Sequence, residues 1–212
     1  MLIQDNFYNI KESILSISSN TKIIAVSKNQ DFSKILQLLK IGHTEFGENK
    51  LQEADLKWKN YTKEYPKVNL HFIGKLQSNK VKDIFGLFNY VHSLDSEKLA
   101  LLFSEIEREN NKKLKYFIQV NIGEEPQKSG ILIKDCKNFV LFCKKLNINI
   151  QGLMCIPPLN KDPKDYFIKL KKINDENNFK ELSMGMSDDF KIAAEIGSTY
   201  VRIGSAIFGK RN

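Results

Sequence analysis

Short apolar runs alternate with longer amphipathic stretches along the whole chain. The first run, Ile23-Ile24-Ala25-Val26, is followed at once by Ser27 and Lys28. A short, continuous apolar run predicts a strand that is buried on both faces, as in a parallel sheet. In the next stretch, 31–41, Phe, Ile and Leu recur at the spacing of one helix face, and Gly42 follows. The pattern therefore predicts a strand and then a helix.

The same alternation continues to the end of the chain and defines the predicted elements. The expected strands are 23–28, 43–46, 70–73, 89–92, 116–120, 148–154, 181–184 and 200–203. The expected helices are 1–20, 31–41, 50–63, 78–87, 95–109, 134–146, 162–177 and 190–196. We expect Ser78 and Asp95 to cap the helices that begin at them, because a side-chain oxygen at that position accepts a free backbone N–H.

About eight strands that alternate with helices match the count of a (β/α)₈ TIM-type barrel, here with one extra helix before the first strand. No Pro-, Gly- or Ser-rich linker divides the chain, so residues 1–212 are expected to form a single domain. An open doubly wound sheet is the alternative. It is disfavoured because no G-x-G-x-x-G motif follows the first strand.

Composition narrows the classes of function. Lys and Arg number 33 against 25 Asp and Glu, a formal net charge of +8. The lysines are spread over many predicted helices and no nucleic-acid motif accompanies them, so a solvated surface is favoured over nucleic-acid binding. No apolar run has the length of a membrane span, and the N-terminus lacks a signal-peptide pattern. Three widely spaced cysteines form no metal-ligand pattern, so we expect a cytoplasmic protein without a metal; they are Cys136, Cys143 and Cys155.

The carboxyl ends of the strands of a barrel form one rim around one pocket. Polar or backbone-special residues follow every predicted strand. They are Lys28, Asn49, Gly74, Ser93, Asn121, Pro157, Ser187 and the group Arg202, Gly204 and Ser205. The rim therefore holds an amine, a guanidinium and several neutral hydrogen-bonding groups.

Lys28 is a candidate for an amine that forms a Schiff base. It follows an apolar strand, and burial disfavours the ammonium, so the reactive neutral form is easier to reach. A solvated loop lysine is the alternative interpretation of this residue alone.

The last two strand ends have the composition of an anion site. Gly185 and Ser187 precede one predicted helix, and Gly204 and Ser205 follow the final strand. Barrels often bind phosphate at these two loops, where backbone N–H groups face the anion. N-capping and tight turns are the alternative. Arg202 lies between Val201 and Ile203, so by alternation it points into the barrel, toward either a structural partner such as a glutamate or the ring nitrogen of a ligand.

A Schiff-base lysine, a phosphate site and an arginine between them describe a pyridoxal 5′-phosphate (PLP) site. Seven segments of this chain also resemble the signatures of the pyridoxal phosphate homeostasis proteins, which are single-domain relatives of the N-terminal barrel of alanine racemase. The resemblance covers essentially the whole chain. The segments are 25–28, 46–49, 71–80, 91–95, 152–154, 182–189 and 201–209.

The resemblance implies a fold type III barrel with PLP as its cofactor. It implies that Lys28 carries PLP as a Schiff base, that Arg202 faces the pyridine nitrogen, and that the phosphate is held by Ser187, Gly204 and Ser205. Asn49 would lie near the ring, with a turn residue as the alternative. Two departures from the family pattern are Ser205 and Cys155, each of which stands where threonine is usual.

The resemblance further implies a carrier that serves intracellular homeostasis of PLP and of amino acids, with no established catalysis. The alternative is a PLP-dependent amino-acid racemase, which needs an acid or base on each face of the substrate Cα. No tyrosine lies at a predicted strand end, and His71 and His92 are expected as core residues. The chain also ends soon after the eighth strand, so we expect neither the second domain of alanine racemase nor its dimer interface, and therefore a monomer.

Lys128, in the polar loop at 123–130, is the remaining candidate. It could reach a second aldehyde or a PLP-dependent apoenzyme that receives the cofactor. A plain surface lysine is the alternative.

Overall fold

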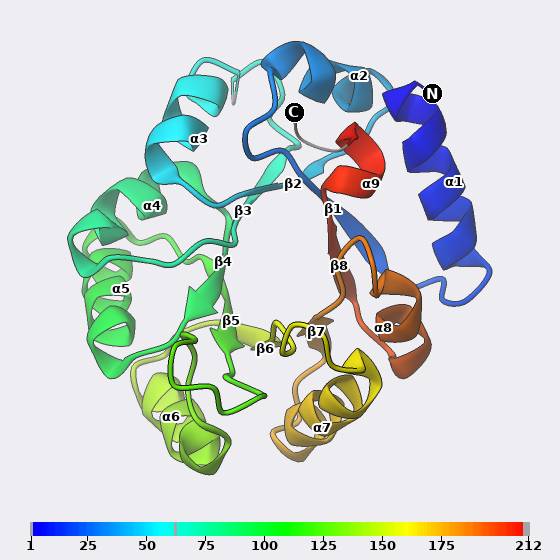
Figure 1. Cartoon of the computed structure of the whole chain (residues 1–212). Helices are drawn as coiled ribbons and strands as arrows, with labels where there is room; N and C mark the ends of the chain where they lie inside the picture. The colour runs from blue at the N-terminus through cyan, green and yellow to red at the C-terminus, as the bar shows by residue number, and fades with distance from the viewer. Residues whose placement is uncertain (1, 62, 210–212) are drawn as a thin grey trace.

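Eight parallel strands form a closed barrel in the computed structural model, which describes residues 2–61 and 63–209. Each strand pairs with its neighbours in chain order, and the first pairs with the last, as Figure 1 shows from one end of the barrel. The strands are β1 (Lys22–Val26), β2 (Glu45–Glu48), β3 (Asn69–Phe72), β4 (Tyr90–Leu94), β5 (Lys115–Gln119), β6 (Ile150–Met154), β7 (Glu181–Ser183) and β8 (Tyr200–Ile203).

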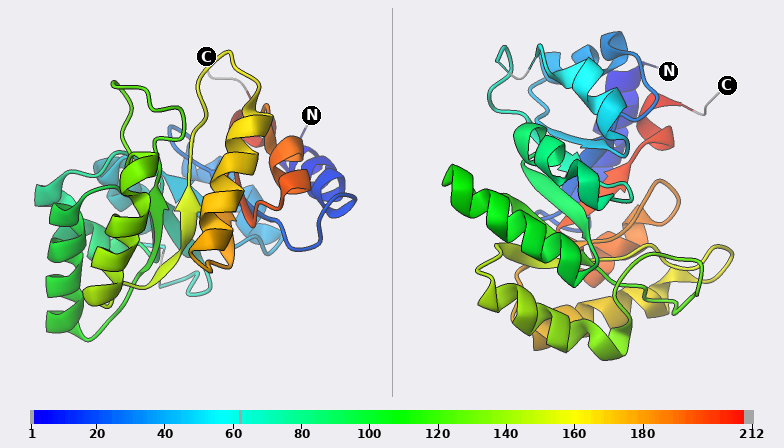
Figure 2. Two further views of the ribbon diagram at one scale, coloured as in Figure 1. Left: turned by 90° about the horizontal axis from the view of Figure 1, so that it is seen from below. Right: turned by 90° about the vertical axis from the view of Figure 1, so that its left-hand side faces the viewer.

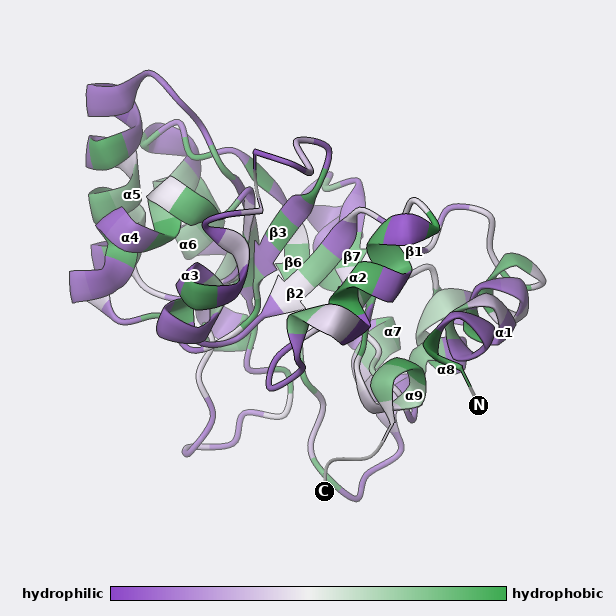
Figure 3. Ribbon diagram, turned by 90° about the horizontal axis from the view of Figure 1, so that it is seen from above, coloured by the Kyte–Doolittle hydropathy of each residue, from purple (hydrophilic) through white to green (hydrophobic). Residues whose placement is uncertain are grey.

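Helices surround the barrel. Figure 3 shows green, apolar segments alternating with purple, polar ones along the helices, as expected for elements with one buried face. The helices are α1 (Ile3–Leu15), α2 (Phe32–Lys40), α3 (Leu51–Trp58), the 3₁₀ turn η1 (Ser78–Lys80), α4 (Val81–Leu87), α5 (Glu97–Asn110), α6 (Ile133–Lys145), α7 (Pro163–Glu176), α8 (Phe190–Ile196) and α9 (Ser205–Phe208). The predicted barrel and its extra N-terminal helix are confirmed.

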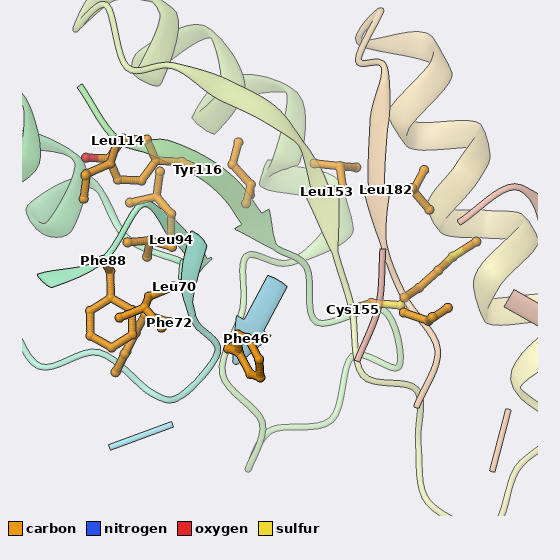
Figure 4. Packing of buried hydrophobic residues seen from close by; sticks show 14 of the residues in the cluster. Phe46, Leu70, Phe72, Phe88, Leu94, Leu114, Tyr116, Leu153, Cys155 and Leu182 are labelled. Atoms are coloured by element: carbon orange, nitrogen blue, oxygen red, sulfur yellow. The ribbon is translucent and has the colours of Figure 1, made fainter. Parts of the chain in front are cut away.

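Two apolar layers follow from strand alternation. Ile23 and Ala25 of β1 face the helices and join the large outer core, part of which is drawn in Figure 4. Ile24, between them, faces the barrel interior. The interior apolar cluster consists of Ile24, Tyr90, Phe117, Met154 and Tyr200. An apolar strand with no polar face is required for this double burial.

The start and the end of the described chain meet at the closure of the barrel. α1 packs against α9, and Asn6 Nδ2 donates to the backbone oxygen of Ile207 at 3.0 Å. In both views of Figure 2 these two helices lie on the same side of the molecule. The contact holds α9, and with it the end of β8, against the first element of the chain.

Several predicted boundaries were wrong in detail. The strand expected at 43–46 is β2, which begins at Glu45 and ends at Glu48, because Gly47 continues the strand rather than ending it. A Cβ on Gly47 would lie 2.8 Å from Ile24 Cγ2, so only glycine fits against the interior there. The helices expected at 1–20 and 50–63 are shorter, and the predictions for Met1 and Thr62 lie outside the described residues.

Both predicted helix caps were also wrong. Ser78 lies inside the turn η1 and makes no capping bond there, and α4 begins only at Val81. The cap of α5 is Ser96, whose Oγ accepts from the backbone N–H of Leu99 at 3.4 Å. Asp95 precedes it because β4 runs on to Leu94, two residues further than the sequence pattern predicted. No helix in the described part of the chain is long and apolar enough to cross a membrane.

Candidate functional site

Lys28 lies just beyond the carboxyl end of β1, in a turn where it is half-buried. Asn29, which follows it, has a left-handed backbone with φ 57°, a conformation that Asn adopts more readily than most residues. Ile24 of β1 faces the barrel interior, and Lys28 follows two residues after the end of that strand. The predicted position of the lysine at the barrel rim is confirmed.

A group of residues from β2 and α3, which we call the β2–α3 clamp, holds the backbone on both sides of Lys28. It consists of Glu48, Glu53, Lys57 and Trp58. Lys57 Nζ donates to the backbone oxygen of Ser27 at 2.6 Å, and Ser27 Oγ donates to Glu48 Oε1 at 2.7 Å. Glu53 accepts from the backbone N–H of Asn29 and forms an ion pair with Lys57. The residues before and after Lys28 are therefore fixed by side chains.

Glu48 is the centre of the clamp and is fully buried. Besides Ser27, it accepts from Trp58 Nε1 at 3.2 Å and forms an ion pair of 3.1 Å with Lys57. Burial raises the pKa of this carboxyl, and the Lys57 charge and the hydrogen bonds oppose that rise only in part. A buried carboxylate with a paired amine is costly to form, and it is tolerated here because every donor around it is in place.

Arg202 is buried in β8 and points inward, as alternation predicted. Its Nη1 donates to the backbone oxygen of Ser183 at 2.8 Å and to Ser183 Oγ at 2.6 Å. Its Nη2 donates to the backbone oxygen of Cys155 at 2.9 Å. The structural partners are thus oxygens of β7 and of the residue that follows β6, rather than a glutamate. Of the five N–H groups of a guanidinium, two have no partner among the described residues.

The two loops expected to hold an anion lie against each other. Ser187 Oγ, in the loop after β7, accepts from the backbone N–H of Ala206 in α9 at 3.4 Å. Gly204 lies against β1, where an added Cβ would be 3.4 Å from the backbone oxygen of Val26. Ser205 is exposed at the start of α9. Gly185 has φ 93°, and a Cβ there would lie 2.5 Å from Ala193 Cβ, so this turn requires glycine.

Asn49 follows β2 and Ser93 is the penultimate residue of β4, and both carry a buried oxygen without a partner among the described residues. Among the described residues, neither Asn49 Oδ1 nor Ser93 Oγ is hydrogen-bonded. Unpartnered buried oxygens are costly and mark places that a bound polar group satisfies. Asn49 also lines a cavity of about 400 Å³ that extends to Lys75. These two oxygens and the two unused N–H groups of Arg202 fit a polar cofactor at this rim.

Lys128 lies at the mouth of the barrel rather than on the outer surface. It lines a cavity of about 290 Å³ together with Gly74 and Asn121. Its Nζ forms an ion pair with Glu125 at 2.6 Å and donates to the backbone oxygen of Pro157 at 3.0 Å. Figure 2 shows the loops after β5 and β6 extending beyond the same end of the barrel. Lys128 therefore bridges these two loops above the rim.

Sequence reasoning missed the clamp. A first signal is an acidic residue, Glu48, at the end of a strand that is otherwise apolar or glycine after Glu45. A second signal is the spacing of Glu53 and Lys57, one helical turn apart. Neither signal says that α3 packs over the end of β1, so the contact with Ser27 and Asn29 could not be derived from the sequence.

The sequence model of one protein family, the N-terminal domain of alanine racemase, matches residues 2–212. The chain belongs to this family. Within the family it is 37% identical to the pyridoxal phosphate homeostasis protein of Vibrio cholerae serotype O1, a match that covers 99% of this chain and 97% of the relative. It is 38% identical to the protein of the same name from Aquifex aeolicus, over 90% of this chain and 87% of the relative.

Solved structures agree with the family assignment. PipY of Synechococcus elongatus PCC7942 with PLP bound matches with a TM-score of 0.90 and 31% identity, over 98% of this chain and 100% of PipY. Alanine racemase of Clostridium difficile 630 matches with a TM-score of 0.79 but only 15% identity, and the match covers 57% of that enzyme. The likeness to the racemase therefore establishes a shared barrel fold and no more.

Proposed function

We propose that this protein binds PLP as a Schiff base on Lys28 and acts as a carrier in the homeostasis of PLP and amino acids. The observation that supports it most is the register of β1 and β8. Arg202 pairs with Ile24 of β1, and Lys28 follows two residues after the end of β1. An amine for the aldehyde and a guanidinium for the ring thus come from neighbouring strands of one rim. The PLP-bound relative PipY supports the same conclusion.

The roles of the individual residues follow from that arrangement. When bound, PLP supplies a reactive aldehyde. Lys28 binds that group covalently, and Ser187, Gly204 and Ser205 hold the phosphate. Asn49 contacts the ring from the end of β2. These assignments rest on the family resemblance, on the contact between the two loops and on the unpartnered Asn49 oxygen.

Arg202 fits a carrier, although racemases tolerate an arginine at this position. A guanidinium donates hydrogen bonds and does not give up its proton, so the pyridine nitrogen opposite it stays unprotonated and withdraws electrons weakly. Racemisation also needs a second acid or base beside Lys28. The interior tyrosines, Tyr90 and Tyr200, are poorly placed for that role, because Tyr90 accepts from Lys115 at 2.9 Å, near the start of β5, and the Tyr200 hydroxyl lies 3.5 Å from that of Tyr90.

The same proposal covers the setting of the protein. We expect one domain over residues 1–212, a monomer in the cytoplasm, and PLP-dependent apoenzymes as recipients of the cofactor. The mouth position of Lys128 makes it a candidate contact for such a recipient. The relatives carry the name of homeostasis proteins rather than of enzymes, which supports a carrier.

The test is the visible absorption of the purified protein with added PLP. The wild type is expected to show a Schiff-base band that borohydride reduction removes, and Lys28→Ala is expected to lose the band entirely. Lys128→Ala is the matched control and keeps the band. Failure of the wild type to bind PLP contradicts the proposal. A racemase assay on amino acids then separates the two functions, and turnover by the wild type would favour the enzyme.

A further inference from the structure

A continuous chain of hydrogen-bonded side chains crosses the barrel interior and ends on Arg202. Ser183 Oγ lies 2.6 Å from Arg202 Nη1 and 2.9 Å from His92 Nδ1. His92 Nε2 lies 2.9 Å from His71 Nδ1, and His71 Nε2 lies 2.7 Å from Glu45 Oε2. We call these five residues the interior chain. It links strands β8, β7, β4, β3 and β2.

When both imidazoles are neutral, the donor at one end and the acceptor at the other leave one direction for every hydrogen bond of the interior chain. The Arg202 guanidinium can only donate, so Ser183 Oγ accepts from it and has its own proton left for His92 Nδ1. His92 must then carry its proton on Nε2 and donate to His71 Nδ1. His71 in turn carries its proton on Nε2 and donates to Glu45, which as a carboxylate only accepts. Each hydrogen bond between successive residues of the interior chain then has one proton, and both imidazoles are neutral.

The surroundings favour these neutral imidazoles. His71 and His92 are fully buried, and burial lowers the pKa of each ring. Glu45 opposes the shift at His71, while Lys22, Lys115 and Arg202 add positive charge nearby. The neighbours that stack on the two rings are uncharged: Tyr90 faces His71 at 4.2 Å and Phe117 faces His92 at 4.4 Å between centroids.

We propose that His71 and His92 are positioning residues that fix the Arg202 guanidinium through Ser183. The inference rests on the proposed function, in which Arg202 faces the PLP ring. The interior chain holds Nη1 against β7, so the two remaining N–H groups keep one direction and face the ring nitrogen. A guanidinium that could turn would lose this alignment, which a donor to a ring nitrogen requires.

A purely structural role is the alternative. A barrel interior can be filled with apolar side chains, as Ile24, Phe117 and Met154 fill the rest of this one. A buried polar chain is no more stable than such a core, and it is costly whenever one link is missing. A structural role predicts that a substitution that interrupts the interior chain changes stability alone. A positioning role predicts a change in the absorption of the bound cofactor as well.

The first test uses the protein without PLP. Nitrogen NMR of the imidazoles reports tautomer and charge for the three histidines of the chain. We expect His71 and His92 to stay neutral with the proton on Nε2 from about pH 5 to pH 8, the range in which an ordinary histidine titrates. A proton on Nδ1 of either ring, or titration of either ring in this range, overturns the assigned direction of the chain.

The second test interrupts the interior chain by substitution and measures the visible absorption and the release of bound PLP. Ser183→Ala removes the link next to Arg202, and His92→Phe replaces a ring by one of similar shape. Tyr200→Phe is the matched control, because it removes an interior hydroxyl whose contact with Tyr90 is 3.5 Å long and lies outside the chain. We expect both chain variants to shift the visible band and its pH dependence, and to release PLP about tenfold faster, the cost of one charged hydrogen bond.

The outcomes separate the two proposals. Ser183→Ala and His92→Phe are compared with Tyr200→Phe in the visible band, its pH dependence and the rate of PLP release. If all three quantities match, the positioning role is wrong although the protein binds PLP. If the wild type shows no band, the proposed function fails and the positioning role with it. Ser183→Ala, which deletes a single oxygen, keeps the test decisive if His92→Phe does not fold.

Discussion

The strand β2 carries a glutamate at each end, and the two have opposite surroundings. Glu45 and Glu48 are three residues apart, so strand alternation directs them to opposite faces of the barrel wall. Glu45 faces the interior, where it begins the chain that ends on Arg202. Glu48 faces the helices, where it holds the backbone beside Lys28. One short strand thus supports both charged groups of the site.

The two carboxyls also differ in acidity. Burial pushes the pKa of Glu45 upward, but the hydrogen bonds from His71 and Asn69 and the nearby Lys22 charge outweigh it, and the pKa falls below its ordinary 4.5. The pKa of Glu48 rises above 4.5, because its complete burial outweighs Lys57 and the three donors. The two pKa values differ although the residue type is the same. The number of donors and the depth of burial decide it.

The largest expected difference between the two glutamates is in stability. Glu48→Ala leaves the Lys57 amine nearly buried without its carboxylate, and removing one partner of a buried pair costs about 3–5 kcal/mol. Glu45→Ala removes the acceptor of a neutral imidazole at a partly exposed site and costs about 1–3 kcal/mol. Urea unfolding of both variants measures the difference, and an equal loss would contradict the distinction between the two faces.

A smaller effect is expected in the pH dependence of stability. Because the pKa of Glu48 is raised on folding, stability falls as the pH rises from 4.5 through the raised value. Because the pKa of Glu45 is lowered, its contribution is present above 4.5 and is lost as the pH falls through the lowered value.

Glu48→Gln should therefore remove the loss of stability that the wild type shows above pH 4.5. Glu45→Gln should remove the loss of stability that the wild type shows below pH 4.5. Unfolding curves for the wild type and both variants on either side of pH 4.5 measure these slopes. If both variants changed the slope on the same side, the opposite signs would be wrong.

The smallest expected effects come from one donor to each carboxyl. Ser27→Ala removes a hydroxyl 2.7 Å from the buried Glu48 and is expected to cost about 1–3 kcal/mol. Asn69→Ala removes an amide 2.8 Å from the more exposed Glu45 and should cost about 0.5–1.5 kcal/mol. Only Ser27→Ala should also slow the reaction of Lys28 with added PLP, because only Ser27 adjoins it. Stopped-flow absorbance measures that rate, and a matching slowdown in Asn69→Ala would contradict this.

Much of the fold follows from the sequence alone. Eight apolar runs separated by amphipathic stretches predict the barrel, because parallel strands joined by helices pair in chain order. Element boundaries were less predictable where two rules compete. Gly47 is a strand breaker by composition, yet it is required in β2 by its contact with Ile24. The position of that contact depends on the register between strands, which a single sequence does not contain.

The positions of two candidate site residues in the fold were predictable to a similar degree. Alternation placed Lys28 at the rim and Arg202 inside the barrel, because both depend on only one strand. His71 and His92 were correctly expected to be core residues, but no sequence pattern connects them. Their partners lie on strands more than 20 residues away, so the interior chain exists only once the barrel has closed.

Barrel closure also determines when the site can exist during protein synthesis. β8 is the last of the eight strands to leave the ribosome, and it carries Arg202 and leads directly into Gly204. It pairs with β1, the first strand made, beside Lys28, while α9 packs on α1. A nascent chain that still lacks β8 presents the lysine without the guanidinium. Lys28 is therefore synthesised early, and the rim around it is completed only when Arg202 and Gly204 have been added.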